Sequence, residues 1–288
     1  MSSTLVSLSS TAPAQPLDES AALAKQNSLL DALRRSTSLL VAFSGGADSA
    51  YLAWAADCAL GERSLSVTAL SASFSRYDRE HAEAFVRAHS LRHEFIETRE
   101  FANPLYVANS GDRCFHCKDE LFVRMESLAR ARGFSAIAYG VNADDTRDFR
   151  PGHRAAHNHR VLSPLLDAGL SKNEIRLLSR YAGLETWDRP ASPCLSSRVP
   201  YGTSVTLDLL SRIERAEDAV RRLGFRQFRV RATEGRARIE IASDELARAL
   251  PPEMSARLVA AVKSAGFPGA FVDPAGYCQG SLNAALAK

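Results

Sequence analysis

A glycine turn directly behind a short apolar run constrains this chain more than any other feature. The run is LLVAF, residues 39–43, and the turn is SGGADS, residues 44–49. The pattern predicts a buried strand that ends in the turn and a helix that opens at Asp48. Backbone N–H groups and two hydroxyls then point to one place at the positive end of a helix dipole, where a phosphate chain binds well. An ordinary turn, with glycines only for positive φ, is the alternative.

The turn is not a Walker loop, because the lysine that follows the second glycine of that motif is absent. It resembles the SGGxDS pyrophosphate loop of the PP-loop ATP pyrophosphatases, which adenylate a substrate and release pyrophosphate. The resemblance implies ATP as a cofactor, with phosphates on Ser44, Gly45, Gly46 and Ser49. Asp48 would help to hold Mg²⁺, which is needed because the leaving pyrophosphate concentrates negative charge.

Strand-like and helix-like segments alternate after the turn. Strands are expected at 65–71, 93–98 and 136–139, and helices at 49–60, 78–89 and 118–132. The fold class is therefore α/β, a doubly wound parallel sheet of the PP-loop ATP pyrophosphatase type. The loops that follow the strands share one rim of such a sheet, so we expect their polar residues to form one site.

The C-terminal part of the chain has a different pattern. Its expected elements are a helix at 206–223, a hairpin of strands 228–232 and 238–241 around Glu234-Gly235, a helix at 254–265 and a strand at 269–273. We therefore divide the chain into a flexible tail (1–25), the PP-loop domain (26–203) and a smaller α+β domain for substrate binding or oligomerisation (204–288).

Composition excludes several classes of protein. A formal net charge of +3 is too small to indicate a nucleic-acid partner. No apolar run approaches the roughly 20 residues that span a bilayer, and the N-terminal segment lacks the basic start and apolar core of a secretory signal. We expect a cytoplasmic protein without a membrane partner, and its five cysteines should be reduced there.

Three cysteines gather on the expected rim. Cys114 and Cys117 form a CxxC on a loop just before a helix, and Cys194 lies in a proline-bounded loop at 192–198. They could serve as a redox pair, as zinc ligands with His116 or His153, or as ligands of a [4Fe–4S] cluster with one open iron. No thioredoxin-like strand precedes the CxxC, and the second CxxC of a structural zinc site is missing.

The sequence pattern assigns no chemical role to the two other cysteines. Cys58 follows Trp54 on the first expected helix and is predicted to be a small core residue. Cys278 has no partner motif, and we assign it no function.

Seven segments together resemble the LarE family of ATP-dependent sulfur transferases. They are SGGADS, RCFHCKDELF, YGVNADD, RPG at 150–152, SPL at 163–165, PCLSSRVPYGT and GYCQGSLN. The resemblance implies a nucleotide substrate, pyridinium-3,5-biscarboxylic acid mononucleotide, whose carboxylates become thiocarboxylates for nickel-pincer nucleotide synthesis. It also implies a sulfide or other sulfur donor and a homo-oligomer.

The family uses two sulfur sources. In one branch, the cysteine that matches Cys194 gives up its own sulfur and becomes dehydroalanine. In the other branch, three cysteines hold a [4Fe–4S] cluster with an extra sulfide. The presence of Cys114 and Cys117 beside Cys194 makes this chain similar to the cluster branch, with sacrifice of Cys194 as the alternative.

Further residues are expected around the nucleotide. Ser73, in the loop after the second strand, lies where PP-loop proteins hold adenine, and Gly140 and Asn142 would flank the nucleotide. Asp145, or its neighbour Asp144, is a candidate second magnesium ligand, with an exposed loop aspartate as the alternative.

Cationic residues are expected to bind the substrate phosphate. Arg229 and Arg231 are two apart on an expected strand, so they share one face and can grip the phosphate together. Arg198, near Cys194, is a second choice. The family resemblance adds Glu217 and Glu240 as site residues that contact a metal, whereas their spacing alone is typical of surface carboxylates.

Other functions remain compatible with the glycine turn. An NAD or GMP synthetase would use ammonia and would not need three cysteines on the rim. A tRNA thiolase would need a basic RNA-binding module, which the charge does not indicate. A non-catalytic ATP sensor would release no pyrophosphate.

Overall fold

The computed structural model describes residues 17–147 and 151–278. Most of the predicted tail, Arg150 of the RPG segment and the GSLN segment at 280–283 therefore lie outside the described residues.

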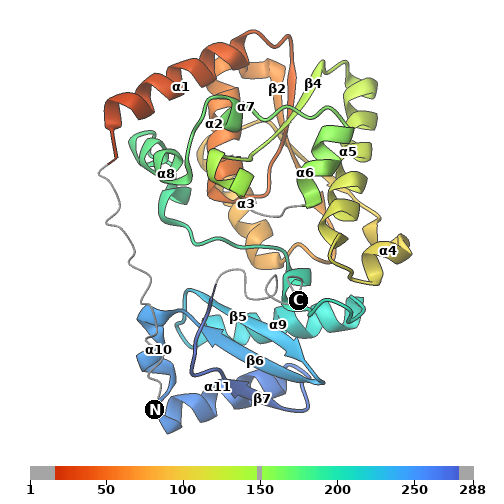
Figure 1. The fold of residues 1–288 in the computed structure, drawn as a ribbon, viewed down its shortest axis with the longest axis vertical. Coiled ribbons are helices and arrows are strands. Elements are labelled where there is room, and N and C mark those ends of the chain that lie inside the picture. Colours follow the sequence, from red (N-terminus) through yellow and green to blue (C-terminus); the bar gives the residue numbers. More distant parts are fainter. Residues whose placement is uncertain (1–16, 148–150, 279–288) are drawn as a thin grey trace, which may run out of the picture.

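Four parallel strands form the larger sheet (Figure 1), which confirms the predicted α/β class. They are β1 (Leu39–Ala42), β2 (Ser64–Leu70), β3 (His93–Glu97) and β4 (Ala136–Tyr139), in the order β3-β2-β1-β4. The winding changes direction between β1 and β4. Doubly wound sheets bind ligands at the carboxyl ends of the strands beside this change, which is where the glycine turn lies.

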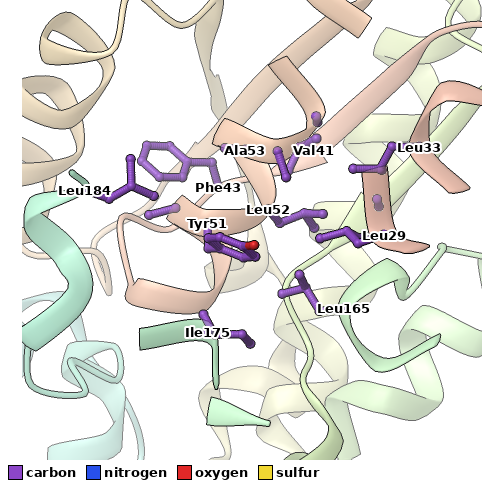
Figure 2. Packing of buried hydrophobic residues seen from close by; sticks show 14 of the residues in the cluster. Leu29, Leu33, Val41, Phe43, Tyr51, Leu52, Ala53, Leu165, Ile175 and Leu184 are labelled. Carbon is purple, nitrogen blue, oxygen red and sulfur yellow. The ribbon is translucent and has the colours of Figure 1, made fainter. Parts of the chain in front are cut away.

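Helices cover both faces of this sheet. One face packs against α1 (Glu19–Arg34), α2 (Ala47–Leu60), α3 (Arg76–Ala88) and α8 (Lys172–Tyr181), and the other against α5 (Arg113–Arg132) and α6 (Pro151–Asn158). The split follows from strand alternation: Val41 joins Tyr51 and Leu165 in the first cluster (Figure 2), whereas Leu40 joins Phe122 in the second.

The C-terminal unit lies below the larger sheet in Figure 1 and holds its own core. Strands β5 (Phe228–Thr233) and β6 (Arg236–Ile241) form the expected hairpin, and β7 (Ala270–Val272) adds in parallel to β6. The unit is completed by α9 (Leu207–Arg222), α10 (Ser243–Ala249) and α11 (Pro252–Ser264). Leu195 and Val199, from the loop that carries Cys194, also pack into this core.

The expectation that the CxxC precedes a helix is wrong. Helix α5 begins at Arg113, because the amides of Phe115 and His116 already bond to the Asp112 carbonyl. Cys114 and Cys117 therefore stand three residues apart in the first turn of α5 and share one helical face.

Two smaller expectations also need correction. Helix α1 begins at Glu19, inside the segment predicted as a tail, because the Asp18 side chain accepts a bond from the Ala21 amide and caps it. Cys58 is exposed and not part of the core, since it lies on the outer face of α2. Among the described helices, none is both long and apolar enough to cross a bilayer.

His159, which directly follows α6, contacts two acidic residues of α5. Its Nδ1 lies 2.9 Å from Glu126 and its Nε2 lies 3.1 Å from Asp119, both on α5. Burial favours the neutral ring, but the bonds to Glu126 and Asp119 outweigh it and raise the pKa of His159.

Replacing His159 with Gln should lower the free energy of unfolding by about 1 kcal/mol at acidic pH, since solvent weakens these half-exposed partners. A raised folded pKa gives stability that is complete below the unfolded value of about 6.5 and is lost as the pH rises through the folded value. Urea unfolding at several pH values should show that the difference in unfolding free energy between wild type and variant becomes smaller as the pH rises. His157→Gln, an exposed neighbour, is the control, and a pH-independent difference would contradict the account.

Candidate active site

The glycine turn presents two hydroxyls at the start of α2. The Ser44 and Ser49 Oγ atoms lie 3.1 Å apart, and the Ser44 amide donates to Ser49 Oγ over 3.2 Å. Gly45 has φ of +73°, and a Cβ there would lie 3.2 Å from the Ala82 Cβ of α3. The turn thus needs glycine for both its conformation and its packing, and it leaves the first amides of α2 open to an anion.

The end of β4 closes the turn from the other side. A Cβ on Gly140 would lie 2.8 Å from the Ser49 nitrogen and 2.9 Å from its Cα, so only glycine fits. Asn142 is fully buried, and its Oδ1 accepts the amides of Asp144 and Asp145. Both residues expected to flank the nucleotide therefore lie beside the turn.

Two carboxylates lie at this junction. Asp145 is buried, whereas Asp144 is exposed and accepts the Lys172 amide. Burial raises the pKa of Asp48, Asp145 reinforces the effect, and Lys172 opposes it. The Asp48 Oδ1 atom is buried with no hydrogen bond of normal geometry from the described residues, although the Asn142 side chain lies close enough to favour the charged carboxylate. A cation would satisfy that atom, so Asp48 and Asp145 fit a magnesium site in their donor chemistry.

Arginines hold the loop that carries Cys194. Prolines at 190, 193 and 200 exclude regular pairing, so the carbonyls of this loop need side-chain donors. These carbonyls and their donors are Trp187 and Arg189 with Arg176, Ala191 with Arg229, Pro193 and Cys194 with Arg198, Ser196 with Arg113, and Ser197 with Arg231. Side-chain donors therefore fix the loop, whose regular structure is limited to short 3-10 turns at Glu185–Asp188 and Leu195–Arg198.

This loop is bonded to the nucleotide side of the site. The Leu195 amide donates to the carbonyl of Ser73 over 2.8 Å, and Arg189 Nη1 donates to the carbonyl of Gly45 over 2.9 Å. Ser73 is buried, and its hydroxyl pairs with that of Ser71 over 2.8 Å. Cys194 thus enters the rim between two contacts with the nucleotide loops.

The three thiols lie close enough to influence one another. Electrostatic interactions connect Cys117 with Cys114 and Cys194, and Cys194 with Cys114. Burial raises the pKa of the Cys194 thiol, although Arg113 and Arg198 oppose it, and burial raises the pKa of Cys117 well above its usual value. The three thiols fit an iron–sulfur cluster by donor type. However, no three His, Cys, Asp or Glu side chains of residues 17–147 and 151–278 form a preformed metal-binding group.

The candidate phosphate clamp is occupied by internal partners. Arg229 and Arg231 lie two apart on β5, as the alternation predicts, and both are buried. Arg231 Nε pairs with Glu240 over 2.7 Å, and Arg198 Nε pairs with Glu217 over 2.8 Å. Arg229 forms no ion pair with a carboxylate among the described residues. Of the three candidate arginines, it is therefore the one whose charge no ion pair neutralises.

The interpretation of Glu217 and Glu240 as surface carboxylates is wrong. Both are buried, because each neutralises a buried arginine. Burial disfavours the charged form of Glu217, but Arg198 outweighs it and holds the pKa of the carboxyl below its usual value.

Sequence reasoning missed two arginines of this site. Arg113 is buried, bonds to Asn109 and Ser196, and is the strongest electrostatic partner of Cys194. Arg189 joins Gly45 to Asp78. Arg113 opens the RCFHCKDELF segment, where its place beside Cys114 was the available signal, whereas Arg189 belongs to none of the seven segments.

The geometry defines a doubly wound α/β protein with a glycine turn at a helix start, next to a proline-bounded loop that carries a cysteine. A synthase of Lactiplantibacillus plantarum, named pyridinium-3,5-bisthiocarboxylic acid mononucleotide synthase, is 31% identical over 270 residues, which cover 92% of this chain and 95% of that protein. The chain belongs to the family of this synthase, the LarE family.

Two uncharacterised proteins are also similar. One from Synechocystis is 41% identical over 249 residues, covering 86% of this chain and 93% of that protein. One from Methanocaldococcus jannaschii is 24% identical over 208 residues, covering 72% and 78%. No protein-family model matches the chain.

Replacing Gly140 with Ala should force Ser49 and the start of α2 to shift, costing about 1–3 kcal/mol of stability and weakening the binding of inorganic pyrophosphate. Gly269→Ala is the matched control, because its Cβ would meet only the flexible side chain of Arg236. Thermal unfolding and calorimetric titration measure both effects. Equal behaviour of the two variants would refute the close approach as a constraint.

Replacing Glu217 with Ala should lower the free energy of unfolding by about 3–5 kcal/mol, because Arg198 is left buried and unpaired. Asp208→Ala, which removes an exposed pair with Arg212 on the same helix, should change it by less than about 0.5 kcal/mol. Denaturant unfolding with and without Mg²⁺ tests whether Glu217 neutralises Arg198 or binds a metal. If Mg²⁺ stabilised the wild type and not the variant, Glu217 would be a metal ligand instead.

Proposed function

We propose that this protein is an ATP-dependent sulfur transferase that converts the carboxylates of pyridinium-3,5-biscarboxylic acid mononucleotide to thiocarboxylates, for nickel-pincer nucleotide synthesis. The observation that carries the proposal is that the segment around Cys194 bonds to both nucleotide loops: Leu195 bonds to Ser73 in the loop after β2, and Arg189 bonds to Gly45 in the glycine turn. A site that only bound ATP, or that used ammonia, would have no need for three thiols at this junction.

The first step is adenylation. ATP places its β and γ phosphates on Ser44, Gly45, Gly46 and Ser49, and Asp48 and Asp145 would hold the magnesium ion that neutralises them. A carboxylate oxygen of the substrate attacks the α-phosphorus, the bond from this phosphorus to the bridging oxygen breaks, and pyrophosphate leaves. The carboxylate is already ionised, so no general base is required and positioning dominates.

The second step replaces the activating group by sulfur. A sulfur nucleophile attacks the acyl carbon, and AMP departs with one oxygen of the original carboxylate. Competing attack by water would regenerate the carboxylate, so the bound substrate has to cover the partly exposed Cys194.

The sulfur source proposed here is a [4Fe–4S] cluster held by Cys114, Cys117 and Cys194. The donor set fits, since three thiols interact electrostatically in one place. When bound, such a cluster would carry an added sulfide, delivered by a separate sulfide donor, and would supply it for the transfer. The polypeptide contributes the three thiolates, the nearby charge of Arg113 and exclusion of water.

Sacrifice of Cys194 is the alternative, and it balances without a cluster. The Cys194 Sγ would attack the acyl carbon to give a thioester and AMP. Loss of the Cys194 α-proton and cleavage of the Cβ–Sγ bond would then release thiocarboxylate and leave dehydroalanine.

We expect the substrate phosphate to bind at Arg229, because the carboxylates Glu240 and Glu217 already neutralise Arg231 and Arg198. Assembly into a homo-oligomer, and location in the cytoplasm, follow the same family expectation.

Replacing Cys194 with Ala should leave pyrophosphate release within about threefold of wild type and abolish thiocarboxylate formation, because adenylation uses a different set of residues. Cys58→Ala and Cys278→Ala, at exposed cysteines, should retain both activities. Anaerobically prepared protein, substrate, ATP and Mg²⁺ are combined, and the products are separated by chromatography with mass detection.

The same preparation distinguishes the sulfur sources. We expect iron and sulfide to be present, and Cys114→Ala and Cys117→Ala to lose both metal and sulfur transfer. Iron-free protein that loses one H₂S from Cys194 after a single turnover would establish sacrifice instead. Retention of sulfur transfer by Cys194→Ala would overturn the proposed function.

A further inference from the structure

A guanidinium links the two halves of the candidate site. Arg189 Nη1 donates to the Gly45 carbonyl over 2.9 Å, and Nη2 donates to Asp78 Oδ1 over 2.9 Å. Its side chain is 13% exposed and that of Asp78 is 11% exposed, so solvent does not replace these contacts freely. No spaced motif contains Arg189, and the adenylation and sulfur-transfer steps above assign it no role.

The contact with Gly45 determines where the next amide points. The Gly45–Gly46 peptide is trans, and in a trans peptide the C=O and N–H bonds point in opposite directions. A carbonyl held by Arg189 on one side therefore turns the Gly46 N–H to the other side. The Gly46 N–H has no acceptor within the described chain, as expected for a donor that awaits a ligand.

Because both flanking residues are glycines, the plane of the Gly45–Gly46 peptide can take more than one orientation. A peptide between two glycines rotates more easily than others, since neither residue carries a Cβ. Gly45 has φ of +73° and packs on Ala82 of α3, which limits movement of its Cα. Packing on Ala82 does not by itself fix the peptide plane, whereas the bond from Arg189 does.

Asp78 in turn fixes Arg189. Its Oδ2 accepts the Ser75 hydroxyl over 2.6 Å, and its amide bonds to the same oxygen of Ser75 at the start of α3. The carboxylate is therefore held by its own helix and presents Oδ1 to the guanidinium. The chain of contacts runs from α3 through Asp78 and Arg189 to the glycine turn.

We propose that Arg189 is a positioning residue that aims the Gly46 amide at the pyrophosphate end of ATP. This proposal rests on the proposed function in one respect only, namely that the anion bound at the turn is the pyrophosphate part of ATP. Because Arg189 lies at the start of the loop that carries Cys194, the same residue fixes the distance between the adenylating turn and the thiol.

Calorimetric titration with inorganic pyrophosphate and Mg²⁺ tests the proposal on the full chain. Arg189→Gln should bind pyrophosphate about tenfold more weakly, the loss expected for one misaligned bond to a charged group. The matched control is Arg226→Gln, which removes an exposed pair with Asp188, the neighbour of Arg189, and no contact with the turn. It should stay within about twofold of wild type.

Asp78→Ala separates positioning from charge. If Arg189 acted only through its positive charge, removal of a nearby carboxylate would strengthen pyrophosphate binding. If Asp78 positions Arg189, the variant should bind about threefold to tenfold more weakly, and its effect should not add to that of Arg189→Gln. Tighter or unchanged binding by Asp78→Ala would overturn the proposal.

Pyrophosphate release from ATP gives a second readout. The ATP concentration for half-maximal rate should rise about tenfold in Arg189→Gln and less than twofold in Arg226→Gln, with thermal unfolding confirming that both variants fold. Equal behaviour of the two variants, with an active wild type, would refute the role of Arg189 alone. A wild type that neither binds pyrophosphate nor releases it from ATP would refute the proposed function itself.

Discussion

The structure depends on the crowded junction between β1 and α2. Ala82 of α3 packs on Gly45, Gly140 of β4 packs on Ser49, and Arg189 bonds to the Gly45 carbonyl. Three separate parts of the chain therefore meet one short turn, and the turn retains open amides only because none of these neighbours covers them. This arrangement prepares an anion site before a ligand arrives, so binding needs little reorganisation.

The second organising feature is the use of buried arginines as structural donors. Proline breaks the Cys194 loop, and guanidinium groups replace the missing backbone partners at its carbonyls. Glu217 and Glu240 neutralise two of these arginines, which makes a buried, charged wall tolerable. Among the described residues, Arg229 and Arg113 form no ion pair with a carboxylate, and Arg113 is instead the strongest electrostatic partner of Cys194.

Much of the fold follows from the sequence, because strand alternation, the glycine turn and the Glu234-Gly235 hairpin are local signals. The start of α5 does not, since the CxxC carries no helical periodicity and only the capping bonds to Asp112 extend the helix to Arg113. The rim could be predicted from the order of strands. The partners of Arg189 could not, because Gly45 and Asp78 lie 144 and 111 residues earlier in the chain. The pairing of Glu217 with Arg198 could not either, because it depends on how the Cys194 loop packs on α9.

The central claim is that the turn activates a carboxylate for replacement by sulfur at the adjacent thiol site. Substrate labelled with ¹⁸O in its carboxylates tests this most directly, by mass analysis of the nucleotide products. The account predicts that AMP gains one labelled oxygen for each thiocarboxylate formed and that pyrophosphate gains none. Label in pyrophosphate, or thiocarboxylate formation with unlabelled AMP, would contradict it.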